Sequence, residues 1–173
     1  MKQQGVALVI SMSLLVLITI IGLSSMRSGI MQQKMATNER DAELSFQATE
    51  IVLRDAENWL SSQTVEPEPT DDGNTNIWKL DAMDPDTTNA QNWWQERDQA
   101  WWNNNGLGYA VAQPNIKTSP RSIIEFQYFK PDDLVIGDGE SSAGTIYYRI
   151  TGQGTGGSDL ARSLLQSTLA KRF

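Results

Sequence analysis

The 173-residue sequence contains no cysteine and no histidine. The chain therefore lacks the thiolate nucleophile, the commonest general base and nearly all zinc ligands. It also has no glycine-rich loop that opens a helix to hold phosphate, and nothing in the sequence places two carboxylates across a cleft. These absences argue against an enzyme, and we expect a non-catalytic protein that works by assembly.

Charged residues are absent between Lys2 and Arg27. The apolar run from Val6 to Met26 would form a helix about 31 Å long, which matches the roughly 30 Å hydrocarbon core of a bilayer. The serine and threonine hydroxyls within it can bond to carbonyls of their own helix, so they do not break the pattern. We predict a transmembrane or filament-core helix over residues 6–26.

A secretory signal peptide is the first alternative for this run. Such a peptide has an apolar region of about 7 to 15 residues followed by a small-x-small cleavage site. Here the run is longer, and Leu23 to Arg27 gives a poor site. Charge does not decide the topology, because Lys2 stands against Arg27, Lys34 and Arg40 beyond the helix.

Proline is absent between Val6 and Val65, and the helical pattern continues past the membrane segment. Two adjoining apolar stripes predict a helix to about residue 61, with a wide buried face that forms the spine of a soluble domain. A coiled-coil dimer is the alternative, although its seam would be narrower. The stripes comprise Ala42, Phe46, Thr49, Leu53, Ala56 and Leu60, and Leu44, Ala48, Ile51, Val52 and Trp59.

A tryptophan-rich insert occupies about residues 77–105, with the pairs Trp93-Trp94 and Trp101-Trp102. We predict one short helix over residues 89–102, in which residues 94 and 101 share a face. Two or three of these side chains could pack as core, while the outer ones would form a partner surface. Because adjacent helical residues point about 100° apart, we expect one of Trp101 and Trp102 in the core and the other facing a partner. Stacking of sugars or bases is a third interpretation.

Two-residue alternation begins after Pro120 and predicts an antiparallel sheet of three strands over about residues 121–171. Turn-rich connections are expected at residues 131–144 and 152–158. Small residues on the third strand would let a helix approach closely. The predicted fold class is α+β, with a long N-terminal helix packed on a C-terminal antiparallel sheet. The strands comprise Ile124, Phe126 and Tyr128; Ile146, Tyr148 and Ile150; and Ala161, Ser163, Leu165, Ser167 and Leu169.

The first of these connections carries Asp132, Asp133, Asp138 and Glu140, which is a weak candidate for Ca²⁺. A solvated acidic loop is the alternative, because the geometry of ligands does not follow from their spacing. We expect no other cofactor. The net charge is −7, so the surface should repel phosphate, and we predict no contact with nucleic acid.

The two ends of the sequence resemble those of pilus proteins. A polar leader that finishes in Gly5, directly before the apolar helix, is similar to the leader of type IV prepilins, which prepilin peptidase cuts after the glycine. Residues 24–28, 35–41, 44–50 and 53–57 resemble the N-terminal signature of PilX-type minor pilins, and residues 148–157 and 165–168 resemble their C-terminal hairpin. Residues 62–120 match no pattern that we know.

This resemblance implies a type IV pilin-like fold. It also implies cleavage between Gly5 and Val6, methylation of the new N-terminus, and a soluble domain over residues 27–173. That domain would be periplasmic while the chain sits in the bacterial inner membrane, and would then belong to the extracellular pilus. The implied partners are prepilin peptidase, the inner-membrane assembly platform, the major pilin, other minor pilins and a PilY-type tip adhesin.

Position in the filament is suggested by an absent carboxylate. Shaft pilins carry Glu at the fifth mature position, which here is Ile10. The resemblance therefore implies a subunit that primes assembly and sits at or near the tip, supporting adhesion, aggregation or twitching motility. The alternatives are a single-pass membrane-anchored interaction domain and a pseudopilin of a type II secretion system.

Overall fold

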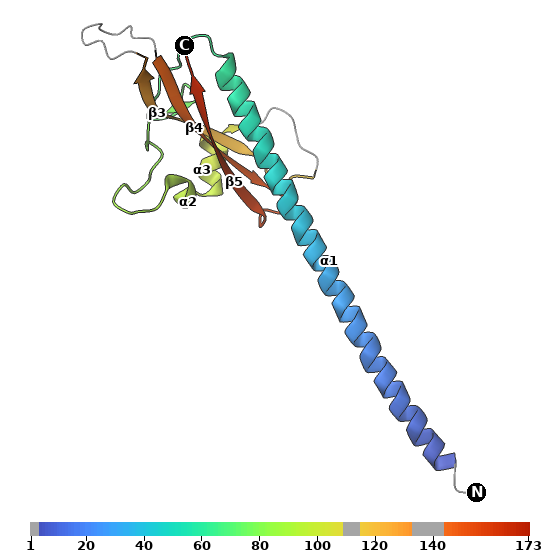
Figure 1. The fold of residues 1–173 in the computed structure, drawn as a ribbon. Helices are drawn as coiled ribbons and strands as arrows, with labels where there is room; N and C mark the ends of the chain where they lie inside the picture. The colour runs from blue at the N-terminus through green and yellow to red at the C-terminus, as the bar shows by residue number, and fades with distance from the viewer. Residues whose placement is uncertain (1–3, 109–114, 133–143) are drawn as a thin grey trace. The chain divides into compact units, whose positions relative to one another are not determined.

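The computed structural model describes residues 4–108, 115–132 and 144–173 (Figure 1). Two compact units divide the chain, Met1–Arg40 and Asp41–Phe173. The predicted long helix is confirmed and runs from Gln4 to Ser62. The elements in the described part of the chain are α1 (Gln4–Ser62), β1 (Ile77–Trp78), α2 (Trp93–Glu96), α3 (Gln99–Asn105), β2 (Leu107–Gly108), β3 (Arg121–Pro131), β4 (Gly144–Thr155) and β5 (Arg162–Lys171).

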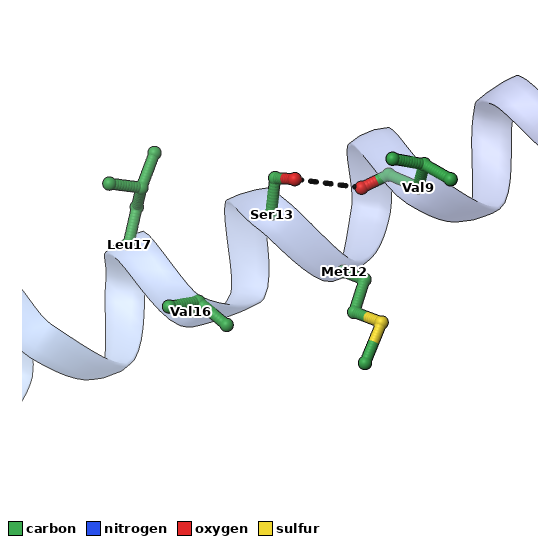
Figure 2. Close-up of a pocket in the computed structure, with 5 residues that line it drawn as sticks. All are labelled: Val9, Met12, Ser13, Val16 and Leu17. Carbon is green, nitrogen blue, oxygen red and sulfur yellow. Dashed lines mark hydrogen bonds between the residues drawn. The ribbon is translucent and has the colours of Figure 1, made fainter.

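The apolar segment of α1 exposes its side chains all round. Its most apolar window has a mean hydropathy of 2.8 and none of its surface is buried, so α1 is long and apolar enough to cross a membrane. The predicted bonding of its hydroxyls is confirmed, since Ser13 donates to the Val9 carbonyl at 2.9 Å and Thr19 to that of Leu15 at 2.7 Å. Figure 2 shows the Ser13 bond and the apolar side chains that stand out from the helix around it. These hydroxyls are thereby satisfied without water.

The sheet has the strand order β1-β3-β4-β5, and β2 also pairs with β3. Strands β3, β4 and β5 are antiparallel, as predicted, and lie beside one another in Figure 1. The prediction of a purely antiparallel sheet is wrong, because β1 pairs with β3 in parallel through Ile77 and Ile124. Strand β1 opens the insert and β2 follows directly after it, and the surrounding turn-rich sequence concealed both.

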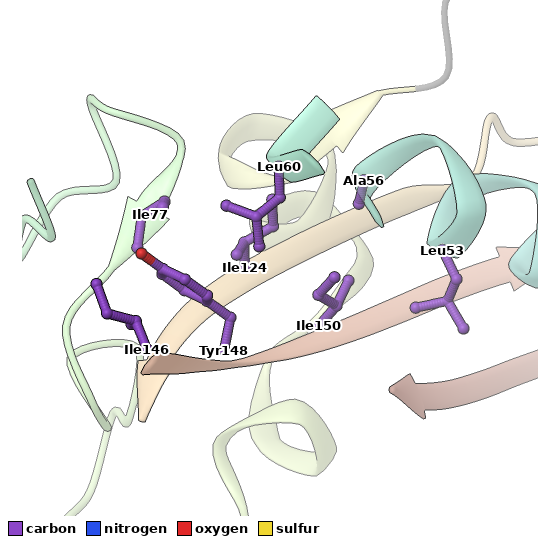
Figure 3. Packing of buried hydrophobic residues seen from close by; sticks show 8 residues of the cluster. All are labelled: Leu53, Ala56, Leu60, Ile77, Ile124, Ile146, Tyr148 and Ile150. Atoms are coloured by element: carbon purple, nitrogen blue, oxygen red, sulfur yellow. The ribbon is translucent and has the colours of Figure 1, made fainter. Parts of the chain in front are cut away.

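The C-terminal part of α1 packs on one face of the sheet. Leu53, Ala56 and Leu60 contact Ile124 and Ile150 in a continuous buried cluster, which Figure 3 shows with its other members. Burying one such aliphatic side chain contributes about 1.5 to 3 kcal/mol. The cluster also contains Ile77, Ile146 and Tyr148. This packing confirms the predicted arrangement of helix on sheet.

Glycines on β4 bring the strand unusually close to α1. A Cβ atom at Gly154 would stand 2.6 Å from the Thr49 hydroxyl and 2.9 Å from the Ser45 carbonyl oxygen. The predicted connection over residues 152–158 is therefore wrong, because β4 continues to Thr155. These glycines serve close packing between helix and strand, and the turn comes after them.

At the start of the buried stripe of α1, the buried residues are not the ones predicted. Phe46 remains 45% exposed and Ala42 is also exposed, whereas Ser45 is buried. Beside Gly154 only a small side chain fits, and the Ser45 hydroxyl lies 2.6 Å from that of Ser163 on β5. The turn of helix nearest the glycines thus buries small polar residues in place of large apolar ones.

Hydrogen bonds fasten the C-terminal hairpin in a chain without cysteine. The Asp41 carboxylate accepts hydrogen bonds from the Ser158 backbone N–H at 3.1 Å and from the Ser158 hydroxyl. These bonds hold the pKa of Asp41 below its usual value. In the middle of β5, Ser167 donates a hydrogen bond of 2.5 Å to Glu57. The hairpin is therefore tied to α1 at its turn and along its last strand.

A β-bulge moves Tyr128 to the other face of the sheet. Phe126 pairs with Tyr148, but the register then shifts and Tyr128 pairs with Tyr147. The rings of Tyr128 and Tyr147 stack with centroids 4.6 Å apart. The predicted alternation of Ile124, Phe126 and Tyr128 on one face is wrong for Tyr128, because the extra residue Gln127 reverses the pleat.

Candidate partner surface

The insert covers the face of the sheet opposite α1. Neighbouring residues of β3 point to the two faces, so Ile124 joins the cluster beneath α1 and Ile123 joins the tryptophans. The second cluster contains Trp78, Met83, Trp93, Trp102 and Ile123. The sheet is thus covered on both faces, and the insert belongs to the core of the unit Asp41–Phe173.

The tryptophans lie on two short helices. The prediction of a single helix over residues 89–102 is wrong, because Asp98 takes an extended conformation between α2 and α3. Its carboxylate accepts a hydrogen bond from the Trp101 backbone N–H at 2.8 Å and caps α3. An aspartate three residues before Trp101 is a sequence signal for this second helix start. Trp94 and Trp101 consequently do not share one helical face.

The four predicted tryptophans form one aromatic cluster with different exposures. Trp93 lies 5.5 Å from Trp102 and 5.8 Å from Trp101, measured between ring centroids. Trp93 and Trp102 are buried, whereas Trp94 and Trp101 are half-buried. The partner surface can therefore include only Trp94 and Trp101, and their role in binding stays a prediction. Trp78, which sequence reasoning left out, contacts Trp101 at 5.8 Å.

An ion pair is buried beneath Trp94. Glu125 on β3 is fully buried and lies opposite Arg149 on β4, with Oε2 2.6 Å from the arginine Nη2. Its Oε1 accepts a hydrogen bond of 2.8 Å from the Asp81 backbone N–H. The Arg149 guanidinium lies 4.8 Å from the centre of the Trp94 ring. The pair thereby links β3, β4 and the insert.

Burial controls the ionisation of this glutamate. Loss of water raises the pKa of Glu125, although the Asp81 N–H bond and the Arg149 charge oppose the shift. The sequence pattern predicted only that Glu125 points away from Ile124 and Phe126. Its burial could not be foreseen, because it depends on the insert that covers it.

Only one of the four candidate calcium ligands lies among the described residues. Asp132 pairs with Arg172 at 2.5 Å, whereas Asp133, Asp138 and Glu140 lie outside the described residues. Among the residues that the structure describes, no three acidic side chains converge as metal ligands would. The calcium site stays an untested prediction.

The predicted processing residues lie at the start of α1. Gly5, Val6 and Ile10 are all helical, and Ile10 is 60% exposed. The structure therefore presents an uncharged position where a shaft pilin would carry a carboxylate. Cleavage after Gly5 stays a prediction.

The long apolar helix and its packing on a sheet define a pilin-like α+β protein. Comparison with family models identifies two matches, "Type IV pilus assembly protein PilX C-term" over residues 44–171 and "PilX N-terminal" over residues 4–54. The chain belongs to the PilX family and is a minor pilin associated with type IV pili. Searches of curated proteins and of solved structures give no match.

Membership of this family points to a structural protein that interacts with other components of the type IV pilus. The apolar helix is consistent with that assignment, since it provides an anchor in the membrane and a surface for association with the pilus. The chain therefore joins an assembly.

Proposed function

We propose that this protein primes type IV pilus assembly and sits at or near the pilus tip. The observation that carries the proposal is the uncharged apolar run around Ile10. A carboxylate inside the bilayer costs roughly 2.5 to 3.5 kcal/mol on insertion scales, so it is retained only where an amine receives it. A first subunit has no neighbour above it, and therefore has no amine to neutralise.

The proposal includes processing between Gly5 and Val6. Removal of the leader frees an amine at Val6, which a glutamate of the next subunit below would meet. The helix would then leave the membrane and pack against helices of its neighbours. Prepilin peptidase and the inner-membrane assembly platform are the partners that these two steps require.

The soluble unit would face outward from the tip, with Trp94 and Trp101 at a contact with another minor pilin or a PilY-type tip adhesin. In support, both rings retain exposed surface on a rigid aromatic cluster, and tryptophan is enriched at the energetic centres of interfaces. Adhesion, aggregation or twitching motility would follow from what the tip presents. A pseudopilin role is the alternative, and it predicts no incorporation into the type IV pilus.

Labelling a single exposed position on sheared filaments tests the tip location. The chain has no cysteine, so Asn74→Cys introduces one thiol on an exposed turn. Gold coupled to a maleimide should then mark one end of each filament. Label spread along the shaft would overturn the proposal. Deleting the protein should reduce the number of filaments more than their length, because nucleation is the affected step.

A further inference from the structure

The two edges of the sheet are built differently. Beyond the positions that β1 and β2 cover, the outer edge of β3 carries a bulge at Gln127, followed by Lys130 and Pro131. These three devices prevent another strand from pairing. The opposite edge belongs to β5, which pairs with β4 in unbroken register from Arg162 to Lys171.

Strand β5 carries none of these devices between its first and last residues. Between Arg162 and Lys171 it has no proline, no charged residue and no bulge. Among the described residues its only strand partner is β4. Near its start the Thr49 hydroxyl bonds to the Ser163 carbonyl at 3.3 Å, so the unprotected stretch begins at Leu164. A long edge strand without such devices is a template for pairing with another chain.

A groove between α1 and β5 opens beside Leu165 and Gln166 of this edge. Apolar surface from Phe46, Leu53 and Leu165 lines it together with Glu50 and Gln166, and Phe46 is 45% exposed. Arg54 and Glu57 complete the lining. An added strand would place alternate side chains beside this groove, which gives the edge a pocket for recognising an apolar residue.

The charges at the two ends of β5 favour pairing with a different polypeptide over pairing with a second copy of this chain. If two β5 strands paired in antiparallel register, Arg162 of each would lie against Lys171 of the other. Like charges directly opposite each other across two strands are destabilising. A strand that carries carboxylates or neutral residues at its ends would avoid this repulsion.

We propose that the β5 edge from Leu164 to Ala170 accepts an extended segment of a different polypeptide, which adds a further strand to the sheet. The segment places an apolar side chain in the groove beside Phe46, and it has no basic residue opposite Arg162 or Lys171. This surface lies within the soluble unit and does not depend on the position of the protein in the filament.

Proline substitution at two neighbouring residues tests the backbone pairing. In an edge strand, one of any two adjacent residues turns its N–H toward the partner strand and the other turns it outward. We would compare Gln166→Pro and Ser167→Pro in the full chain with Gln166→Ala and Ser167→Ala as controls. Unfolding in detergent micelles identifies the outward residue, whose proline variant should melt within about 2 °C of its alanine control.

Incorporation into sheared pili, relative to the membrane pool, is then measured by immunoblot. The outward proline variant should lose at least about tenfold in incorporation while keeping its stability, because one main-chain bond is absent and the ring obstructs the edge. Incorporation that simply follows melting temperature in both variants would overturn the proposal. Tip labelling at position 74 gives its result independently, so failure of one proposal does not imply failure of the other.

If both proline variants unfold, the accessibility of an introduced cysteine tests the proposal instead. Thr168→Cys places a thiol at an exposed position on the edge, and Asn74→Cys places one on an exposed turn away from the edge as a matched control. A maleimide polymer should modify both thiols in the membrane pool but only the control in pili. A reactive residue 168 in pili would contradict the proposal. A disulfide-linked dimer through residue 168 would show that the occupant is a second copy, which also contradicts it.

Discussion

The ammonium nitrogen of Lys171, at the end of β5, donates a hydrogen bond of 2.7 Å to the carbonyl oxygen of Leu60 in the last turn of α1. It also bonds to the Ser61 carbonyl at 2.9 Å and to the Gln63 carbonyl. The final carbonyls of a helix have no partner within it, and a cation is favourable beside them. One side chain of the last strand thus completes the end of the first helix.

Replacing Lys171 by Met should therefore destabilise the protein by about 1 to 3 kcal/mol, because several helix carbonyls lose their donor. Urea unfolding followed by circular dichroism measures the change. Lys130→Met, at an exposed position of β3, serves as the control and should have little effect. Equal effects of the two substitutions would show that Lys171 does not act through the helix end.

The effect of truncating a tryptophan should depend on how deeply its side chain is buried. Trp102→Ala removes a fully buried side chain and should cost about 3 to 5 kcal/mol. Trp94→Ala removes a half-buried ring and its contact with Arg149, so it should cost less stability but reduce assembly with a pilus partner. Melting temperature and co-purification are the two measurements. Assembly that follows stability in both variants would favour a purely structural role.

Glu125 should make stability depend on pH in an unusual direction. Because the pKa of Glu125 is raised in the folded state, the folded chain binds this proton more tightly than the unfolded chain does. Its contribution to stability is therefore full below the ordinary pKa of glutamate and is lost as the pH rises through the raised value. We expect the stability difference between wild type and Glu125→Gln to fall over this interval.

Urea midpoints at several pH values between about 4 and 8 measure that difference. Glu39→Gln, at an exposed position, is the control and should leave the pH profile of the wild type unchanged. A difference between wild type and Glu125→Gln that grows with pH would contradict the prediction. Asp41 acts in the opposite direction, since its lowered pKa gives a contribution that is lost as the pH falls.

Close packing at Gly154 should not tolerate a methyl group. Gly154→Ala would push a Cβ atom against the Thr49 backbone nitrogen at 2.8 Å and the Ser45 carbonyl. We expect a loss of about 1 to 3 kcal/mol, because backbone atoms cannot move aside as a flexible side chain can. Gly157→Ala meets its nearest atom, the Asn115 carbonyl oxygen, at 3.3 Å and should cost less stability than Gly154→Ala. Thermal unfolding of the two variants gives the comparison.

Processing should depend on the size of residue 5. Gly5→Leu should leave an unprocessed chain in the membrane of cells that contain prepilin peptidase, and mass spectrometry of the extracted N-terminus would detect it. Gly22→Leu is the control, since a side chain there meets nothing within 4 Å in the subunit. Normal maturation of Gly5→Leu would remove the main support for cleavage at this position.

The long helix and the three main strands could be predicted because each follows a strong local periodicity. The face of Tyr128 could not be predicted, since one extra residue at Gln127 reverses the alternation without a clear signal in the sequence. The division of the insert into α2 and α3 has a signal in Asp98, which competes with the stronger impression of four tryptophans at helical spacing.

Burial across the sheet was harder to foresee than the strands themselves. Ile123 and Glu125 lie on a face that an isolated meander would expose to water, so their burial requires knowledge of where residues 77–106 fold. The tryptophans indicated that part of the insert packs as core on the long helix and the sheet. Nothing in their spacing indicated that they cover the sheet face opposite α1.

The fastening of the last hairpin by Asp41, Glu57 and Lys171 has a consequence for how the subunit matures. A hairpin closed by a disulfide needs an oxidant, and it is trapped if the wrong thiols pair. Here closure requires only that the strand meets the helix, so folding is independent of the thiol-oxidation machinery of its compartment. A subunit pulled open can also close again without redox repair.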